Sequence, residues 1–183
     1  MDEVVTKIPE QPKTAKKSFA FVGETSSGKT TTVNSLFGVK LPTSPDANTT
    51  GTNKVFECEK DNYEVYDVYG TNDKECYHSI EKLCQLKTIH YIVFLIGTTF
   101  ESNIEMYRLL SALSKQVIVL RNKTEDFEQS DVLNSQKKCQ EHFGNVFKLF
   151  HVVAHPRKTN DDGVTDKLTD VKDYLAKLPA CKN

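Results

Sequence analysis

The sequence lacks several features that would assign a protein to a class directly. Apolar runs such as residues 91–96 are far shorter than the ~20 residues of a membrane-spanning helix. The formal net charge is −1, so no excess of positive charge favours nucleic acid or an acidic membrane. The first residues have no apolar core and include acidic side chains, which argues against a signal or transit peptide. We therefore expect an intracellular, cytoplasmic protein with no membrane span and no nucleic acid partner.

The sequence also lacks a cysteine pattern. Its five cysteines are an odd number, include no Cys-x-x-Cys pair and do not combine with the five histidines at metal-ligand spacing. We expect unpaired thiols in a reducing compartment, where they pack in the core or lie at the surface.

Between two short ends, strand and helix patterns alternate. Residues 1–17 are expected to form a flexible arm and residues 179–183 a short tail, so that residues 18–178 form one domain. Strand patterns cover residues 18–22, 53–59, 63–68, 89–96, 116–120 and 146–154, and helix patterns cover residues 28–38, 74–87, 102–115, 132–143 and 168–178. This order predicts an α/β fold: a mostly parallel six-stranded sheet with one antiparallel edge strand and helices on both faces.

Three of the predicted helices carry a stripe of side chains expected to face the core. The stripes are Met106, Leu109, Leu110 and Leu113; Val132, Gln136, Cys139 and Phe143; and Leu168, Val171, Leu175 and Leu178. For the stripe that begins at Met106, a core face is a simpler interpretation than a cofactor site.

The first motif with chemical content is GETSSGKT, residues 23–30, which lies between a predicted strand and a predicted helix. In this context the pattern is typical of a phosphate-binding P-loop, whereas elsewhere it would be an ordinary polar turn. Glycines allow a tight turn, and backbone N–H groups at the helix start face an anion. Lys29 supplies a positive charge for the β and γ phosphates, and the Thr30 hydroxyl is a ligand for Mg²⁺. The predicted cradle comprises Gly23, Glu24, Thr25, Ser26, Ser27, Gly28, Lys29, Thr30 and Thr31.

Two further motifs follow later strands. In DVYG, residues 67–70, Asp67 can hold Mg²⁺ through water and Gly70 can offer its N–H to a γ-phosphate, although alone the motif is a strand and a turn. In NKTE, residues 122–125, the Glu125 carboxylate can accept the N1–H and 2-amino protons of guanine. Asn122 can contact N7 or O6 and tie back to the P-loop, while the Lys123 stem packs along the base. Alone, this motif is a charged surface turn.

Together, and in this order, the three motifs resemble the guanine-nucleotide-binding (G) domain of the translation-factor-type P-loop GTPases. The resemblance covers residues 18–178 and is closest to the Era-like, septin-like and immunity-related branches. Residues 23–38 and 98–126 are most similar to the immunity-related branch. The resemblance implies a Ras-like fold, binding of GTP, GDP and Mg²⁺, and hydrolysis of GTP to GDP and phosphate coupled to switch movement.

The resemblance also implies further site residues. A switch threonine that binds Mg²⁺ and acts with Lys29 in catalysis is expected at Thr49, Thr50 or Thr52, and Thr50 is favoured by its distance from Asp67. A base-binding loop is expected at Ala154, whose N–H would reach guanine O6, with His155 in place of the usual lysine.

Departures from the family pattern qualify these expectations. Thr71 stands where Ras-type enzymes have a water-orienting glutamine, so hydrolysis is expected to be slow or to need a partner or a dimer across the nucleotide face. Glu125 replaces the usual aspartate, with Asp126 beside it as an alternative, which weakens guanine selectivity. Two other hypotheses stay open: a nucleotide-gated interaction module with little hydrolysis, and an ATP-dependent kinase. The kinase is disfavoured because the chain has only three arginines to clamp phosphate.

Overall fold

A six-stranded sheet runs through the part of the chain described by the computed structural model, which comprises residues 16–41, 54–58, 63–70, 89–113, 116–154 and 164–180. Its strands are β1 (Lys17–Gly23), β2 (Lys54–Cys58), β3 (Tyr63–Gly70), β4 (Tyr91–Ile96), β5 (Gln116–Arg121) and β6 (Lys148–His151). Their order is β2-β3-β1-β4-β5-β6. Only the β2–β3 pair of this sheet is antiparallel, and it lies at one edge. The predicted sheet is therefore confirmed.

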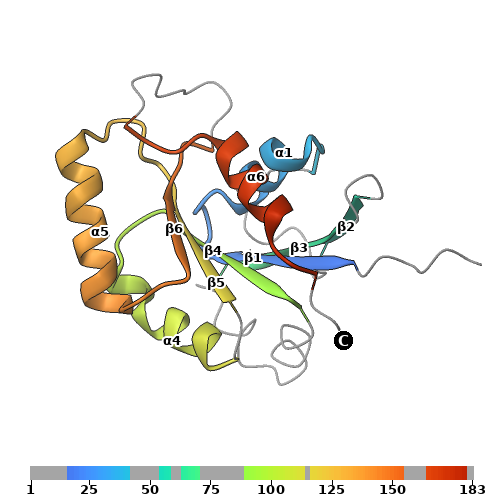
Figure 1. The fold of residues 1–183 in the computed structure, drawn as a ribbon, viewed down its shortest axis with the longest axis horizontal. Helices are drawn as coiled ribbons and strands as arrows, with labels where there is room; N and C mark the ends of the chain where they lie inside the picture. The colour runs from blue at the N-terminus through green and yellow to red at the C-terminus, as the bar shows by residue number, and fades with distance from the viewer. Residues whose placement is uncertain are drawn as a thin grey trace, which may run out of the picture.

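Helices cover both faces of the sheet. They are α1 (Lys29–Phe37), α4 (Ile104–Ala112), which follows the short 3-10 helix η1 (Glu101–Asn103), α5 (Gln129–Phe143) and α6 (Leu168–Lys177). Figure 1 shows α1 and α6 on one face and α4 and α5 on the other. The helix predicted over residues 74–87 lies outside the described residues. Among those described, no helix has both the length and the apolar character needed to cross a membrane.

The central strands are apolar throughout because both of their faces are covered. Phe19 and Phe21 of β1 pack on the side of α1 and α6, whereas Ala20 and Val22 pack on the side of α4 and α5. All six residues of β4 are buried. Alternation of side chains along a strand thus divides one apolar run between two cores, which fixes the register of the sheet.

Two of the predicted helix faces need correction, and the α6 face does not. In α5, Ser135 is buried and Gln136 is exposed, because the small Ser135 hydroxyl hydrogen bonds to the buried His151 ring while the longer amide remains in solvent. In α4, Tyr107 is buried beside Leu110, whereas the predicted Leu109 is only partly buried. The Tyr107 ring stacks on Phe143 with the ring centroids 4.2 Å apart.

Some element ends also differ from the prediction. The strand predicted over residues 146–154 is shorter, because β6 pairs with β5 only as far as His151. Helix α1 ends as predicted at Gly38, whose φ of 67° is the left-handed conformation that glycine tolerates best.

Candidate functional site

The loop between β1 and α1 is held in shape by two glycines that cannot be replaced without displacement. A Cβ atom on Gly23 would lie 2.3 Å from the backbone oxygen of Leu95 in β4. One on Gly28 would lie 2.3 Å from Nδ2 of Asn122, and Gly28 has a φ of +95°. The loop is therefore packed directly against β4 and against the residue that follows β5.

Lys29 is folded back onto this loop. Its Nζ donates hydrogen bonds to the backbone oxygens of Gly23, at 2.9 Å, and Glu24, at 2.7 Å. Its side chain is largely buried, with a relative exposure of 8% for the residue. The positive charge thus lies against the start of the loop, where the sequence predicts that phosphate binds.

The amino-terminal end of α1 fits an anion. Gly28 is the N-cap, no side chain of the described residues caps it, and the first turn carries no acidic residue. The first turn of an α-helix leaves N–H groups without intrahelical acceptors and carries a partial positive charge. Together with the Lys29 ammonium, this donor set matches a nucleotide's phosphates in chemistry and sign.

Asn122 joins three loops at the carboxyl edge of the sheet. Its Nδ2 donates to the Ser27 backbone oxygen at 2.8 Å, and its Oδ1 accepts from the Ala154 N–H at 3.0 Å. Its own N–H donates to the Ile96 oxygen at 2.9 Å, and the residue is 4% exposed. The predicted tie from Asn122 to the P-loop is present. The Ala154 N–H is donated to Asn122 here, so its contact with guanine remains a prediction.

The rest of the NKTE segment alternates between anchored and exposed residues. Lys123 is exposed in a left-handed conformation with φ of 61°. Thr124 is fully buried and donates from Oγ1 to the Val152 oxygen at 3.0 Å, while Glu125 is half-buried. Thr124 is an anchor that sequence reasoning missed, since a threonine in a charged turn gives no sign of burial.

The DVYG segment lies beside the P-loop. β3 ends at Gly70, whose Cα pairs with that of Gly23 in the register between β1 and β3. The strand thus brings the backbone of the second motif next to the first. The side chain of Asp67 is outside the description, and Thr50, Thr71 and His155 lie outside the described residues, as do Thr49 and Thr52.

His151 is the last residue of β6, three positions before Ala154, and it is anchored by contacts that sequence reasoning missed. The ring Nε2 of His151 lies 2.8 Å from the Ser135 Oγ. The backbone N–H of His151 donates a hydrogen bond to Asp166 Oδ2 at 2.8 Å. Burial lowers the pKa of His151, with Asp166 opposing that shift. Through these contacts His151 connects β6 to α5 and to the segment that precedes α6.

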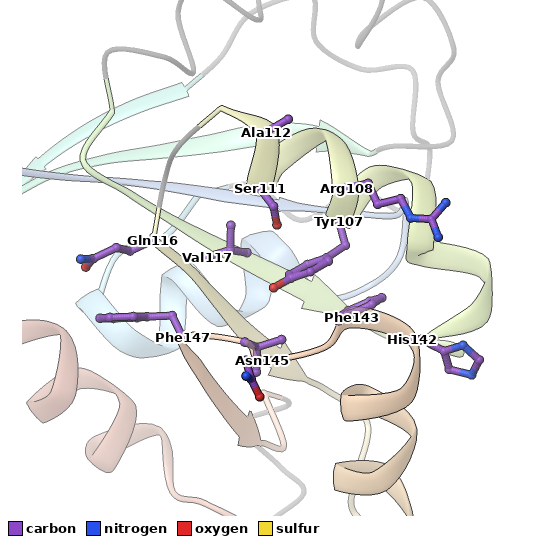
Figure 2. A pocket seen from close by; sticks show the side chains of 11 residues that line it. Tyr107, Arg108, Ser111, Ala112, Gln116, Val117, His142, Phe143, Asn145 and Phe147 are labelled. Carbon is purple, nitrogen blue, oxygen red and sulfur yellow. The ribbon is translucent and has the colours of Figure 1, made fainter.

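A pocket of about 780 Å³ lies at the other end of the sheet. Figure 2 shows Tyr107 and Ser111 of α4 pointing into it, beside Gln116 and Val117 at the start of β5. Asn122 follows the opposite end of β5, so this pocket and the P-loop lie at opposite ends of the parallel strands. The pocket is not part of the predicted nucleotide site.

Comparison with known families decides the class of protein. The sequence profile of the 50S ribosome-binding GTPase family matches residues 18–123, which is more than half of the chain. The chain belongs to this GTPase family. The match includes the P-loop, the DVYG segment and the first two residues of NKTE, and guanine-nucleotide binding is the property expected of the family.

Solved structures confirm the Ras-like P-loop GTPase fold at low sequence identity. A probable GTP-binding protein, EngB, is 16% identical with a TM-score of 0.59 and covers 87% of this chain and 97% of its own. Era, in complex with MgGDPNP and a segment of 16S ribosomal RNA, is 22% identical with a TM-score of 0.63, covering 92% of this chain and 59% of its own. An S. thermophilus NFeoB variant bound to GDP and aluminium fluoride is 20% identical with a TM-score of 0.55, covering 81% and 61%. No curated protein matches significantly.

Proposed function

We propose that the protein binds GTP and GDP at the P-loop and hydrolyses GTP to GDP and phosphate as a nucleotide-dependent switch. The observation that supports this most is the bridge made by Asn122, which connects the P-loop to the Ala154 loop through two hydrogen bonds of one amide. A phosphate site and a base site would thereby be held at a fixed separation. Residues 18–178 are proposed as the domain that performs this function, with residues 1–17 and 179–183 as its ends.

In the proposed reaction, water attacks the γ-phosphate and the protein stabilises charge. Lys29 and the loop N–H groups interact with the phosphate oxygens, on which negative charge redistributes as the bond to the leaving GDP breaks. Thr30, Thr50 and Asp67 would hold Mg²⁺, which neutralises phosphate charge when bound. Mg²⁺ in such sites takes part of its coordination from the phosphates and from water, so few protein ligands would be needed.

Guanine selectivity is proposed to come from Glu125, with the Lys123 stem along the base and Ala154 and His155 at its O6 side. Measuring GTP and ATP affinities of Glu125→Gln and of the matched Asp126→Asn tests this proposal. We expect Glu125→Gln to reduce the preference for GTP about tenfold, since a charged hydrogen bond partner is lost. If Asp126→Asn produces the loss instead, Asp126 is the base-reading carboxylate. Equal GTP and ATP affinities in the wild type would contradict the proposal.

The second candidate is an interaction module that binds nucleotide with little hydrolysis, and Thr71 is the sequence feature that favours it. Single-turnover hydrolysis at several protein concentrations separates the two functions. A rate independent of concentration would support the switch enzyme acting alone. A rate that rises with concentration would support a homodimer across the nucleotide face. No turnover by the protein alone would favour the interaction module or a need for an activating protein, two cases that the addition of cell extract distinguishes.

The partner proposed for this chain is therefore a guanine nucleotide, together with an effector that the sequence does not identify. The Era structure contains ribosomal RNA. This chain spans only 59% of Era, so the RNA of that complex is not carried over to this chain. Because the net charge is −1, we propose no nucleic acid partner. We also propose an intracellular location, because the odd number of cysteines without a Cys-x-x-Cys pair fits a reducing compartment.

A further inference from the structure

The P-loop contains a carboxylate, Glu24, whose position is unexpected beside phosphates. Its Oε2 accepts a hydrogen bond from Thr98 Oγ1 at 2.6 Å. Its Oε1 accepts from Asn103 Nδ2 at 3.3 Å and from Ser102 Oγ at 3.4 Å. These donors all belong to residues 97–103, the turn that leads from β4 to α4, and we call this segment the β4–α4 turn.

The β4–α4 turn also touches the P-loop through backbone. A Cβ atom on Gly97 would lie 3.0 Å from the Ser27 Cα, so the turn packs directly against the loop. Asn103 is 1% exposed and its Nδ2 also donates to the Thr99 oxygen at 2.8 Å, which fixes the amide orientation toward Glu24. Arg121 adds a positive charge near Glu24. The carboxylate thus has both donors and a counter-charge on the side of the turn.

Glu24 connects this cluster to the phosphate-binding lysine. Its backbone oxygen accepts the hydrogen bonds of Lys29 Nζ, at 2.7 Å, and of the Ser27 N–H, at 3.1 Å. Any movement of Glu24 therefore moves an acceptor of Lys29. If phosphates bind this loop as proposed, release of the carboxylate from its donors would place a negative charge beside them and repel them.

We propose that Glu24 is a positioning residue, held by Thr98 and Asn103, that sets the shape of the P-loop and couples nucleotide affinity to the β4–α4 turn. This inference rests on the proposed nucleotide binding. It implies that the start of α4 and the phosphates influence each other through one carboxylate, so that a change at the turn alters nucleotide affinity without touching the nucleotide.

The first test compares two exposed neighbours on the turn. Thr98→Val removes the hydroxyl that donates to Glu24, whereas Thr99→Val removes a hydroxyl that contacts Ser102 and not Glu24. The measurement is the GDP dissociation constant by fluorescence titration, together with the melting temperature without nucleotide. We expect Thr98→Val to weaken GDP binding about three- to tenfold and Thr99→Val to leave it unchanged. Equal effects of the two variants would overturn the inference.

The second test exchanges donor and acceptor. Asn103→Asp faces Glu24 with a second carboxylate and is expected to weaken GDP binding about tenfold or more. The double variant Glu24→Gln/Asn103→Asp restores one donor and one carboxylate at wild-type net charge, so affinity is expected to return to within about threefold. Thr99→Asp adds the same charge to the turn without the contact and serves as the charge control.

The outcomes distinguish this inference from the proposed function. If the wild type binds no guanine nucleotide, the proposed function fails. If it binds, and Asn103→Asp does not weaken binding more than Thr99→Asp, the positioning role of Glu24 is wrong. A change in melting temperature without a change in the GDP dissociation constant would show a purely structural contact and would also overturn the inference. The same conclusion would follow if GDP affinity did not recover in the double variant.

Discussion

The amino-terminal ends of the helices differ in a way that separates structure from function. At α5 and α6 an aspartate in the first turn, Asp131 or Asp170, accepts the N–H of the N-cap residue at 2.9 Å and 3.0 Å respectively. At α1 the N-cap is Gly28 and the first turn is Lys29, Thr30 and Thr31, without an acid. A negative side chain stabilises the start of a helix, and α1 lacks this stabilisation. The first turn of α1 is therefore left for an anion from outside the chain.

Replacing the N-cap glycine of α1 is expected to have the largest effect. Gly28→Ala places a Cβ against Asn122 at a φ of +95°, which costs about 1–2 kcal/mol for the left-handed backbone, with a further ~1–3 kcal/mol if the Asn122 hydrogen bonds are displaced. Urea unfolding and GDP titration should show losses of both stability and affinity. Wild-type affinity in this variant would mean that the loop adopts another conformation when it binds nucleotide.

Giving α1 the acid that α5 and α6 possess tests the comparison directly. Thr31→Asp is expected to raise the stability of the nucleotide-free protein by about 0.3–1 kcal/mol through the helix dipole. The same carboxylate competes with phosphate, so GDP affinity is expected to fall about tenfold. The two measurements should therefore move in opposite directions. A rise in both, or no change in GDP affinity, would show that phosphate does not use this helix end.

Removing the acid from the other helices is the converse experiment. Asp131→Asn and Asp170→Asn are each expected to reduce stability by about 0.5–1 kcal/mol, because a charged acceptor in the first turn is lost. GDP affinity should remain at the wild-type value in both variants. A loss of affinity in either would mean that these helix ends also contribute to nucleotide binding.

The smallest expected effect on stability comes from protonation of His151, whose ring contacts Ser135 of α5. Burial lowers the pKa of His151 in the folded state, so below its ordinary pKa of about 6.5 the unfolded chain binds the proton more readily. The folded state is therefore not penalised by His151 above about pH 6.5. As the pH falls from there toward the lower pKa of the folded state, protonation of the unfolded chain reduces the free energy of unfolding. Unfolding of the wild type and of His151→Gln at pH 7.5 and 5.5 should show the smaller decrease in the variant. An equal decrease would exclude His151 as the source.

Sequence reasoning predicted the sheet and the loop because each depends on local patterns. The pattern of residues 23–30, from Gly23 to Thr30, between a predicted strand and a predicted helix is enough to recognise the P-loop. Apart from the predicted tie of Asn122 to the P-loop, long-range contacts were not predictable in the same way. Glu24 and Asn103 meet across 79 positions of sequence, and nothing local to either residue indicates the other. Helix periodicity likewise could not decide between Ser135 and Gln136, because the partner that selects Ser135 is a histidine on another element.

The central claim is that the acid-free start of α1, with Lys29, holds guanine-nucleotide phosphates. It is tested most directly by the melting temperature of the wild type and of Lys29→Ala in the presence of GDP, GTP or ATP, because a ligand that binds the folded state raises that temperature by mass action. We expect GDP and GTP to raise the melting temperature of the wild type, ATP to raise it much less, and none to raise that of Lys29→Ala. No rise with GDP in the wild type, or an equal rise in the variant, would contradict the account.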